Sequence, residues 1–400
     1  MNSILVFGAG KIGRSFIGQI FALSGYEVIF CDIDPVIVGL LNERKSYPVV
    51  IKNDEKETTI NVPVAKAILA TNEKEIIEAV SKTTLIATSV GKNALSAIVP
   101  LIAKGVLHHG RPDVSLPLDI IIAENMLSAG EFLRAELMKH LPATFPFDTI
   151  IGLVETSIGK MVPIMSQEET AKDPLMVFAE PYNELIVDGK GFKGGIPHVK
   201  WLAPKDNIKA WVERKAFIHN LGHATAAYYG AFRHSKAVYL YEALQDNEVL
   251  SFTRKTMHQA ALVLNRLYPE ELTLPGLKAH IDDLLQRFQN RALKDTIFRV
   301  GQDLPRKLGP DDRFMGIIRL AINLKMDYSQ ILKAMAFAFV FKGYDEKGNR
   351  SARDLVFERQ MKKGIDNILT NICGLDMARD EAFICELRKE VEDITHSQPA

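Results

Sequence analysis

The chain has 400 residues, of which 47% are hydrophobic and 24% are charged, as is usual for a globular protein of about two or three domains. Its 49 basic residues balance its 49 acidic residues, which argues against a general nucleic-acid binder because such proteins carry a basic excess. The three cysteines, Cys31, Cys373 and Cys385, show no pairing pattern and predict a reducing compartment rather than a disulfide framework.

The N-terminus runs directly into an apolar strand and lacks the basic and apolar regions of a signal peptide. An apolar stretch around residues 331–341 is interrupted by Lys333 and is too short to cross a bilayer. We therefore expect a cytoplasmic protein without a membrane partner.

The first half of the chain alternates between segments typical of strands and of helices. Short apolar runs predict strands at Ile4–Phe7, Glu27–Cys31, Thr84–Ala87 and Asp119–Ala123, with further strands expected at Ile150–Pro163 and Leu175–Val187. Helical spacing predicts helices at Ile12–Leu23 and Pro35–Asn42. This alternation predicts an α/β fold with a doubly wound, Rossmann-type parallel sheet.

The second half of the chain is dominated by helical periodicity. A segment rich in glycine and proline, Lys190–Pro204, marks the expected boundary between a Rossmann-type domain of residues 1–200 and a mostly α-helical domain of residues 201–400. Helices are expected from Asp206 to about Tyr229 and at Glu248–Tyr268, Leu277–Arg287, Arg313–Asn323 and Tyr328–Phe341.

The first turn carries the GxGxxG fingerprint of dinucleotide-binding domains, formed by Gly8, Ala9, Gly10, Lys11, Ile12 and Gly13. The motif follows a predicted strand and opens a predicted helix, which is the context that this fingerprint requires. Gly8 allows the tight turn, Gly10 lets the backbone approach a pyrophosphate, and Gly13 lets helix and strand pack closely. The free N–H groups of the helix N-terminus would face the phosphates.

Asp32 ends the second predicted strand, 19 residues after Gly13. Its carboxylate is expected to bind the adenosine ribose hydroxyls and to repel a 2′-phosphate, which favours NAD over NADP. A second contact with the cofactor is expected at Ser89, Val90 and Gly91, where small residues leave room for a nucleotide. For both segments the alternative is a glycine-containing turn without a ligand.

Lys215, Asn220 and His223 fall within one predicted helix. At about 100° per residue, Asn220 lies near 140° and His223 near 80° from Lys215, so the three side chains can share one face. Hydride removal from a secondary alcohol also releases the hydroxyl proton, and a lysine with a lowered pKa can accept it. An asparagine amide can hold the developing alkoxide, and an imidazole can orient the lysine. The pattern favours an NAD-dependent oxidoreductase with a helical catalytic domain, although a solvated lysine is the alternative.

The spacing of His219 and His223 could also hold zinc on one helix face. The segment lacks the glutamate of the zinc-protease motif, and no cysteine or acidic cluster suggests a third ligand. We therefore expect no metal, and His219 packed or on the surface.

Several motifs together resemble those of the mannitol-1-phosphate 5-dehydrogenases, which belong to the polyol-specific long-chain dehydrogenases. The resemblance covers residues 3–375 and rests mainly on the segments Phe7–Gly18 and Glu213–His223. It continues through Ile122–Met126, Asp173–Leu175, Ile186–Asp188, Arg287–Asn290, Leu293–Asp295, Arg299–Gly301 and Arg306–Leu308.

The resemblance implies a metal-independent, NAD-dependent interconversion of mannitol 1-phosphate and fructose 6-phosphate, with the substrate between the two domains. Lys215 matches the general acid/base of the family, and His223 matches the histidine beside it. Asn125 and Asn220 match the amides that hold the reacting oxygen, with Asn125 also next to the cofactor.

Arg299 and Lys307 match substrate-binding positions of the family, and we expect Arg306 or Arg313 to assist them. The composition of this segment also favours an anion-binding site, because residues 287–313 hold seven Lys and Arg against four Asp and Glu. Arginine is suited to grip phosphate or carboxylate. A solvated basic face is the alternative.

Gly159 and Lys160 depart from the family, which usually has an Asp-Arg pair there. The anionic group of the substrate is therefore open, and reduction of a sugar acid such as tagaturonate or fructuronate is an alternative function. A catalytically silent NAD(H)-sensing protein is a remote one. The sequence does not fix the oligomeric state.

Overall fold

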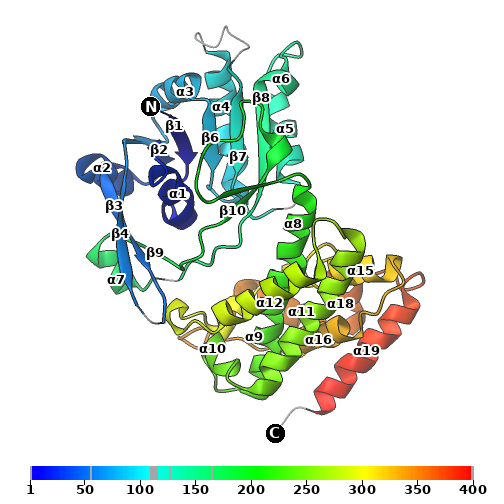
Figure 1. Ribbon diagram of the computed structural model, residues 1–400. Helices are drawn as coiled ribbons and strands as arrows, with labels where there is room; N and C mark the ends of the chain where they lie inside the picture. The colour runs from blue at the N-terminus through cyan, green and yellow to red at the C-terminus, as the bar shows by residue number, and fades with distance from the viewer. Residues whose placement is uncertain (1, 55, 109–115, 127, 164, 398–400) are drawn as a thin grey trace. The chain divides into compact units, whose positions relative to one another are not determined.

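A computed structural model describes residues 2–54, 56–108, 116–126, 128–163 and 165–397 (Figure 1). The chain divides into two compact units, Met1–Val212 and Glu213–Ala400. The expected division of function after residue 200 stays a prediction. Each unit is described by itself.

The first unit is built on an eight-stranded sheet with the order β11-β10-β8-β7-β6-β1-β2-β5. Its strands are β1 (Ser3–Phe7), β2 (Glu27–Asp32), β5 (Lys66–Leu69), β6 (Leu85–Thr88), β7 (Leu118–Ile122), β8 (Ile151–Ser157), β10 (Leu185–Asp188) and β11 (Leu202–Lys205). From β5 to β8 all neighbours are parallel, and β10 pairs antiparallel with β8. The strand order reverses at β1, between β2 and β6, and open α/β sheets bind ligands at such switch points.

Side-chain alternation along the strands divides the core of this unit between the two faces of the sheet. Ile4 and Val6 of β1 pack with the helical segments that follow β1 and β2, which are the π-helix η1 (Gly13–Gly18), α1 (Gln19–Ala22) and α2 (Pro35–Arg44). Leu5 and Phe7 pack on the opposite face with α3 (Glu73–Lys82), α4 (Lys92–Leu107) and α5 (Ala129–Met138). The expected doubly wound α/β architecture is therefore confirmed.

A smaller sheet in the same unit has the order β4-β3-β9, with strands β3 (Ser46–Ile51), β4 (Thr58–Pro63) and β9 (Val177–Ala179). The sequence reading did not expect the β3–β4 hairpin. It also joined β9 and β10 into one strand, whereas Pro181 lies in the segment that separates them. Proline has no backbone N–H to donate to a neighbouring strand, so it is typical of a position where a strand is interrupted. The short helices α6 (Phe147–Ile150), α7 (Gln167–Lys172) and η2 (Gly189–Gly191) complete this unit.

The second unit is helical, as expected. Its elements after α8 (Ile208–Arg214) are the π-helix η3 (Lys215–Asn220), α9 (Leu221–Arg233), α10 (Leu240–Ala243), α11 (Asn247–Leu267), α12 (Leu274–Phe288), η4 (Arg291–Leu293), α13 (Ile297–Gly301), α14 (Leu304–Lys307), α15 (Met315–Asn323), α16 (Ser329–Val340), α17 (Ala352–Met361), α18 (Ile365–Asn371) and α19 (Glu381–His396). Figure 1 shows α16 among its neighbours, and it packs on α9, α11 and α19. Accordingly, α16 is apolar around most of its circumference and its residues Ile331–Phe339 are almost all buried.

The run from α8 through η3 to α9 is continuous helix, but it is not the uniform α-helix that the sequence predicted. Residues Lys215–Asn220 form a π-helix, in which the backbone hydrogen bonds span five residues instead of the four of an α-helix. The angular positions expected from 100° per residue therefore do not apply across this segment. Single π-helical turns of this kind occur frequently at functional sites.

Candidate active site

The glycine turn after β1 has the geometry that its residue types predict. Gly8 has a φ of +96°, and a Cβ there would lie 2.5 Å from the Ser89 carbonyl oxygen. A Cβ on Gly13 would lie 1.9 Å from the Gly8 carbonyl oxygen, so helix and turn are in direct backbone contact. A Cβ on Gly10 would meet no heavy atom within 4 Å. Gly10 is thus not required by packing, and its open side fits the close approach of a pyrophosphate.

Asp32 contacts this turn directly. Its Oδ2 accepts a hydrogen bond from the Ala9 N–H at 2.6 Å, and its Oδ1 accepts one from the Asp34 N–H at 3.0 Å. The carboxylate is partly exposed, so it retains acceptor capacity for the ribose hydroxyls of a dinucleotide. The residues of the turn and Asp32 together fit a dinucleotide whose ribose carries no 2′-phosphate.

The loop after β6 is held by a carboxylate that sequence reasoning did not select. Glu124 accepts hydrogen bonds from the Val90 and Gly91 N–H groups, at 2.9 Å each. The hydroxyl of Ser89 donates to the Gly8 carbonyl at 3.0 Å, which ties the same loop to the glycine turn. Burial of Glu124 raises the pKa of its carboxyl group, partly offset by the two backbone N–H donors. Glu124 lies in the motif Ile122–Met126, but the sequence analysis gave a role only to its neighbour Asn125.

Lys215 is the first residue of the π-helix η3 and is partly buried. Burial, followed by the positive charges of Arg313 and Arg306, lowers the pKa of its ammonium group to about 8. At neutral pH such a lysine is mainly protonated, but it loses its proton far more readily than an exposed lysine. It therefore meets the chemical requirement for a general acid/base.

Arg313 connects the three residues of the predicted face. Its Nη1 donates to the Asn220 carbonyl oxygen at 3.2 Å, at the last residue of η3. Its charge lowers the pKa of both Lys215 and His223. Asp312 fixes the guanidinium by accepting from its Nε at 2.7 Å. The expected part of Arg313 in substrate binding stays a prediction, whereas its charge acts on Lys215 and its guanidinium bonds the last residue of η3.

His223 lies between an aromatic ring and a carboxylate. Its ring stacks on Phe288, with ring centroids 4.6 Å apart and an interplanar angle of 14°. Its Nε2 lies 3.2 Å from Asp295 Oδ2, although the two groups are not aligned for a hydrogen bond. Burial and the charges of nearby arginines, Arg299 first, lower the pKa of the imidazole well below its usual value, so the ring is neutral near pH 7.

His219 is buried and packs its ring against His223 and Phe288, with centroid distances of 6.1 and 5.6 Å. Within the described ranges, no group of three or more His, Cys, Asp and Glu side chains is arranged to hold a metal ion. The two histidines thus form an aromatic cluster with Phe288, which lies in the motif Arg287–Asn290 but was given no role from the sequence.

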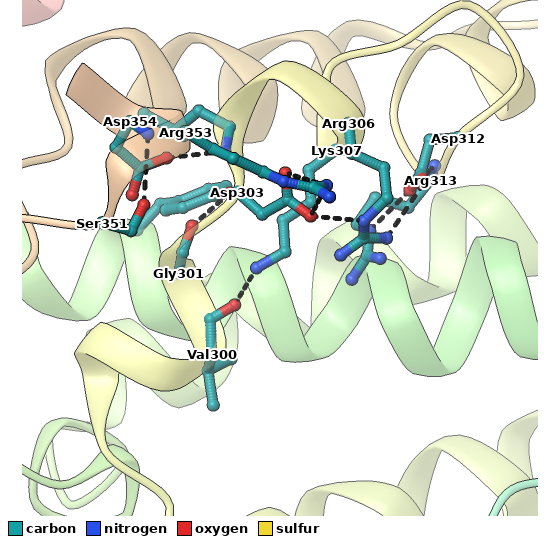
Figure 2. Close-up of polar contacts among 12 residues, drawn as sticks. Val300, Gly301, Asp303, Arg306, Lys307, Asp312, Arg313, Ser351, Arg353 and Asp354 are labelled. Carbon is teal, nitrogen blue, oxygen red and sulfur yellow. Dashed lines mark hydrogen bonds and ion pairs between the residues drawn. The ribbon is translucent and has the colours of Figure 1, made fainter. Parts of the chain in front are cut away.

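Arg299, Arg306 and Lys307 line one pocket of about 400 Å³ in the second unit. Arg299 pairs with Asp295. Arg306 pairs with Asp303 and Asp312, as Figure 2 shows. Lys307 is only 4% exposed, and its ammonium group donates to the Val300 carbonyl oxygen. Its burial lowers the pKa of the amine well below the usual value.

Asn125 follows β7 and is exposed in the first unit. Its expected place beside Lys215 stays a prediction. The departure from the family pattern, Gly159 and Lys160, also lies in the first unit. Lys160 is buried, donates to the Asn183 side-chain oxygen and lies 5.2 Å from the ring centre of Phe16.

Comparison with known proteins gives a consistent result over the whole chain. A family model described as the mannitol dehydrogenase Rossmann domain matches residues 2–201, and one described as the mannitol dehydrogenase C-terminal domain matches residues 207–395. A Streptococcus mutans protein named mannitol-1-phosphate 5-dehydrogenase is 33% identical over 98% of this chain and 100% of its own length. A Bacillus velezensis protein of the same name is 32% identical over 93% of this chain and 95% of its own length.

Two solved structures share the fold. Mannitol 2-dehydrogenase from Pseudomonas fluorescens, in a ternary complex with NAD and D-mannitol, superposes with a TM-score of 0.77 over 98% of this chain and 92% of that chain, at 14% identity. A D-sorbitol dehydrogenase has the same TM-score over 99% of this chain and 94% of that chain, at 16% identity.

Proposed function

The chain belongs to the mannitol dehydrogenase family, and on that premise we propose that it interconverts mannitol 1-phosphate and fructose 6-phosphate. Family membership over both halves makes it an NAD-dependent polyol dehydrogenase. Full-length relatives named mannitol-1-phosphate 5-dehydrogenase support the phosphorylated substrate. The structural observation that supports a phosphorylated substrate is the pocket lined by Arg299, Arg306 and Lys307. An uncharged polyol would not require several cationic side chains.

NAD would be held by the glycine turn, Asp32 and the loop of Ser89, Val90 and Gly91. Asp32 favours NAD over NADP because its carboxylate would repel a 2′-phosphate. When bound, NAD accepts a hydride from the polyol carbon or, as NADH, returns one to the ketose carbon.

Lys215 is the proposed general acid/base. Its amine takes the hydroxyl proton when the polyol is oxidised, and its ammonium group returns a proton when the ketose is reduced. The pKa of about 8 supports this role, since both protonation states are accessible near neutral pH. Asn125 and Asn220 would donate their amide N–H groups to the reacting oxygen, and neutral His223 would orient the groups around the lysine. The assignment needs no metal ion, so incubation with a chelator is expected to leave turnover unchanged.

The proposal includes cytoplasmic location and small-molecule partners. Cys31, Cys373 and Cys385 are free thiols, which fits a reducing compartment. Zero formal net charge gives no general affinity for nucleic acid. Among the described residues, no helix is both long and apolar enough to span a membrane.

The test is oxidation of NADH by the purified protein with fructose 6-phosphate, fructose, tagaturonate and fructuronate in parallel. Turnover with fructose 6-phosphate alone, and with NADH in preference to NADPH, is expected. Turnover confined to a uronate would overturn the phosphate assignment, and the buried Lys160 would then be the first position to exchange. Absence of turnover with all four substrates, despite tight NADH binding, would overturn the enzymatic assignment.

A further inference from the structure

The pocket in the second unit has a second wall that no sequence motif indicated. Besides Arg299, Arg306 and Lys307, the pocket is lined by Ser351 and Arg353 at the start of α17. Its described lining thus carries four cationic side chains, Arg299, Arg306, Lys307 and Arg353, against one carboxylate, Asp303. A pocket of about 400 Å³ with this excess of positive charge is chemically suited to a small anion.

Asp303 joins the two walls of this pocket. Its Oδ2 accepts from Arg306 Nε at 2.7 Å, and both of its carboxylate oxygens lie 3.1 Å from Arg353 Nη1. Figure 2 shows dashed lines from Asp303 to both guanidinium groups, one from α14 and one from α17. Asp303 itself has a φ of +71°, which is uncommon outside glycine and presets the direction of its side chain. Two arginines that are distant in sequence are thereby held as a pair.

The backbone behind this pair is also fixed. The buried carboxylate of Asp354 accepts from the Leu304 N–H at 2.8 Å, which ties the start of α14 to the first turn of α17. The Ser351 hydroxyl accepts from the Asp354 N–H at 3.1 Å and caps α17. The arginines therefore sit on a preorganised frame rather than on a loose surface.

Each arginine keeps hydrogen-bonding capacity beyond Asp303. A guanidinium has five N–H donors in a planar fork that matches phosphate oxygens. The Arg306 and Arg353 side chains are 44% and 67% exposed, so solvent-borne anions can reach them. The N-terminal turn of α17, a helix of ten residues, adds free backbone N–H groups and a partial positive charge on the same wall.

We propose that Arg353 and Arg306 form a phosphate subsite, with Asp303 as a positioning residue, and that this subsite selects phosphorylated over neutral substrates. The inference rests on the proposed function, because it assigns the phosphate of the sugar phosphate to these residues. It adds Arg353 and Asp303 to the residues expected from the sequence. Lys307 lies at the buried side of the pocket, where a bound dianion would favour its charged form.

The test compares Arg353→Gln with Arg359→Gln. Arg359 is exposed on the same helix and does not line the pocket. Its substitution therefore removes the same charge from α17 without altering the subsite. For Arg353→Gln, the KM for fructose 6-phosphate is expected to rise roughly tenfold or more, since a charge-assisted hydrogen bond is lost. The kcat at saturating fructose 6-phosphate and the NADH dissociation constant are expected to stay near wild type. Arg359→Gln is expected to change none of them.

A second readout does not require turnover. Inorganic phosphate is expected to inhibit the wild type competitively against fructose 6-phosphate, with a weaker inhibition constant in Arg353→Gln and partial recovery in Arg353→Lys. An unchanged KM and an unchanged phosphate inhibition constant in Arg353→Gln would overturn the subsite while leaving the proposed function intact. A wild-type protein that does not turn over fructose 6-phosphate would overturn the proposed function instead.

Discussion

The glycine turn of the first unit and the Lys215 region of the second unit are built in opposite ways. The turn is made mainly of backbone, and its geometry depends on consecutive residues, with Gly13 in contact with Gly8 five positions earlier. The Lys215 region is made of side chains drawn from η3, α9, α13, α14 and the segment before α15, whose charges act on one another. The geometry of the turn is set mainly by neighbouring residues, whereas the Lys215 region exists only after a helical core has formed.

The two regions depend on different chemical properties. In the turn, the important property is the absence of side chains, so an added methyl group is the sharpest perturbation. In the Lys215 region, the important properties are the burial of the lysine amine and, after it, the positive charges of Arg313 and Arg306. There, removal of a charge is the sharpest perturbation.

The largest effect is expected for Lys215→Ala, which removes the proposed proton carrier. Turnover should fall roughly 10²- to 10⁴-fold, the usual contribution of a general acid/base. NADH affinity, measured by fluorescence titration, should stay at the wild-type value because the cofactor residues lie elsewhere. Lys255→Ala, an exposed lysine of α11, is the matched control. Near-normal turnover in Lys215→Ala would show that another group carries the proton.

Two glycine substitutions separate packing from ligand contact in the turn. Gly13→Ala should destabilise the fold by about 1–3 kcal/mol or more, because its Cβ would lie 1.9 Å from the Gly8 carbonyl oxygen. Gly10→Ala should leave the thermal unfolding midpoint unchanged, since a Cβ there meets no atom within 4 Å. It should nevertheless weaken NADH binding by roughly tenfold or more, as a methyl group would face the pyrophosphate. Normal NADH affinity in a folded Gly10→Ala protein would exclude a close approach of the cofactor at this position.

The pH dependence of turnover tests the electrostatics of the Lys215 region. Polyol oxidation needs the neutral amine, so its kcat should rise with pH through about 8. Ketose reduction needs the ammonium form, so its kcat should fall above the same pH. Arg313→Met removes a cation that lowers the pKa of Lys215, so both inflections should move to higher pH by up to about one unit.

Arg266→Met, an exposed arginine of α11, is the control for this shift. Because Arg313 also bonds the Asn220 carbonyl, circular dichroism of the variant should accompany the kinetics. An inflection that stays in place, in a protein that remains folded, would mean that Arg313 does not act on the titrating group.

The smallest effect is expected for Glu124→Gln, which tests how far the Val90–Gly91 loop depends on a side chain. Glutamine retains one acceptor oxygen but presents an amide N–H to one of the Val90 and Gly91 N–H groups. The loop should loosen, and the NADH dissociation constant should rise roughly three- to tenfold. Glu131→Gln, at an exposed position of α5, should leave it unchanged. Equal NADH affinities in the two variants would make Glu124 dispensable for the loop.

The sequence by itself determined the α/β fold, the helical second half and the family. Hydrophobic periodicity and glycine spacing are local properties, so β1, the glycine turn and Asp32 could be read from neighbouring residues. The Lys215, Asn220 and His223 pattern was also visible. The local signal failed at Lys215–Asn220, where the periodicity predicted a uniform α-helix and the structure has a π-helix.

Only the tertiary structure decided which distant residues act together. Glu124 follows β7 and bonds the Val90–Gly91 loop that follows the neighbouring strand β6, and Asp295 lies beside His223 from the segment before α13. Arg353 meets Asp303 although 50 residues separate them. Ion pairs and burial depend on distances in space, and the chain reveals those distances only once its helices and strands have packed. For the same reason the lowered pKa of Lys215 belongs to the fold rather than to any motif.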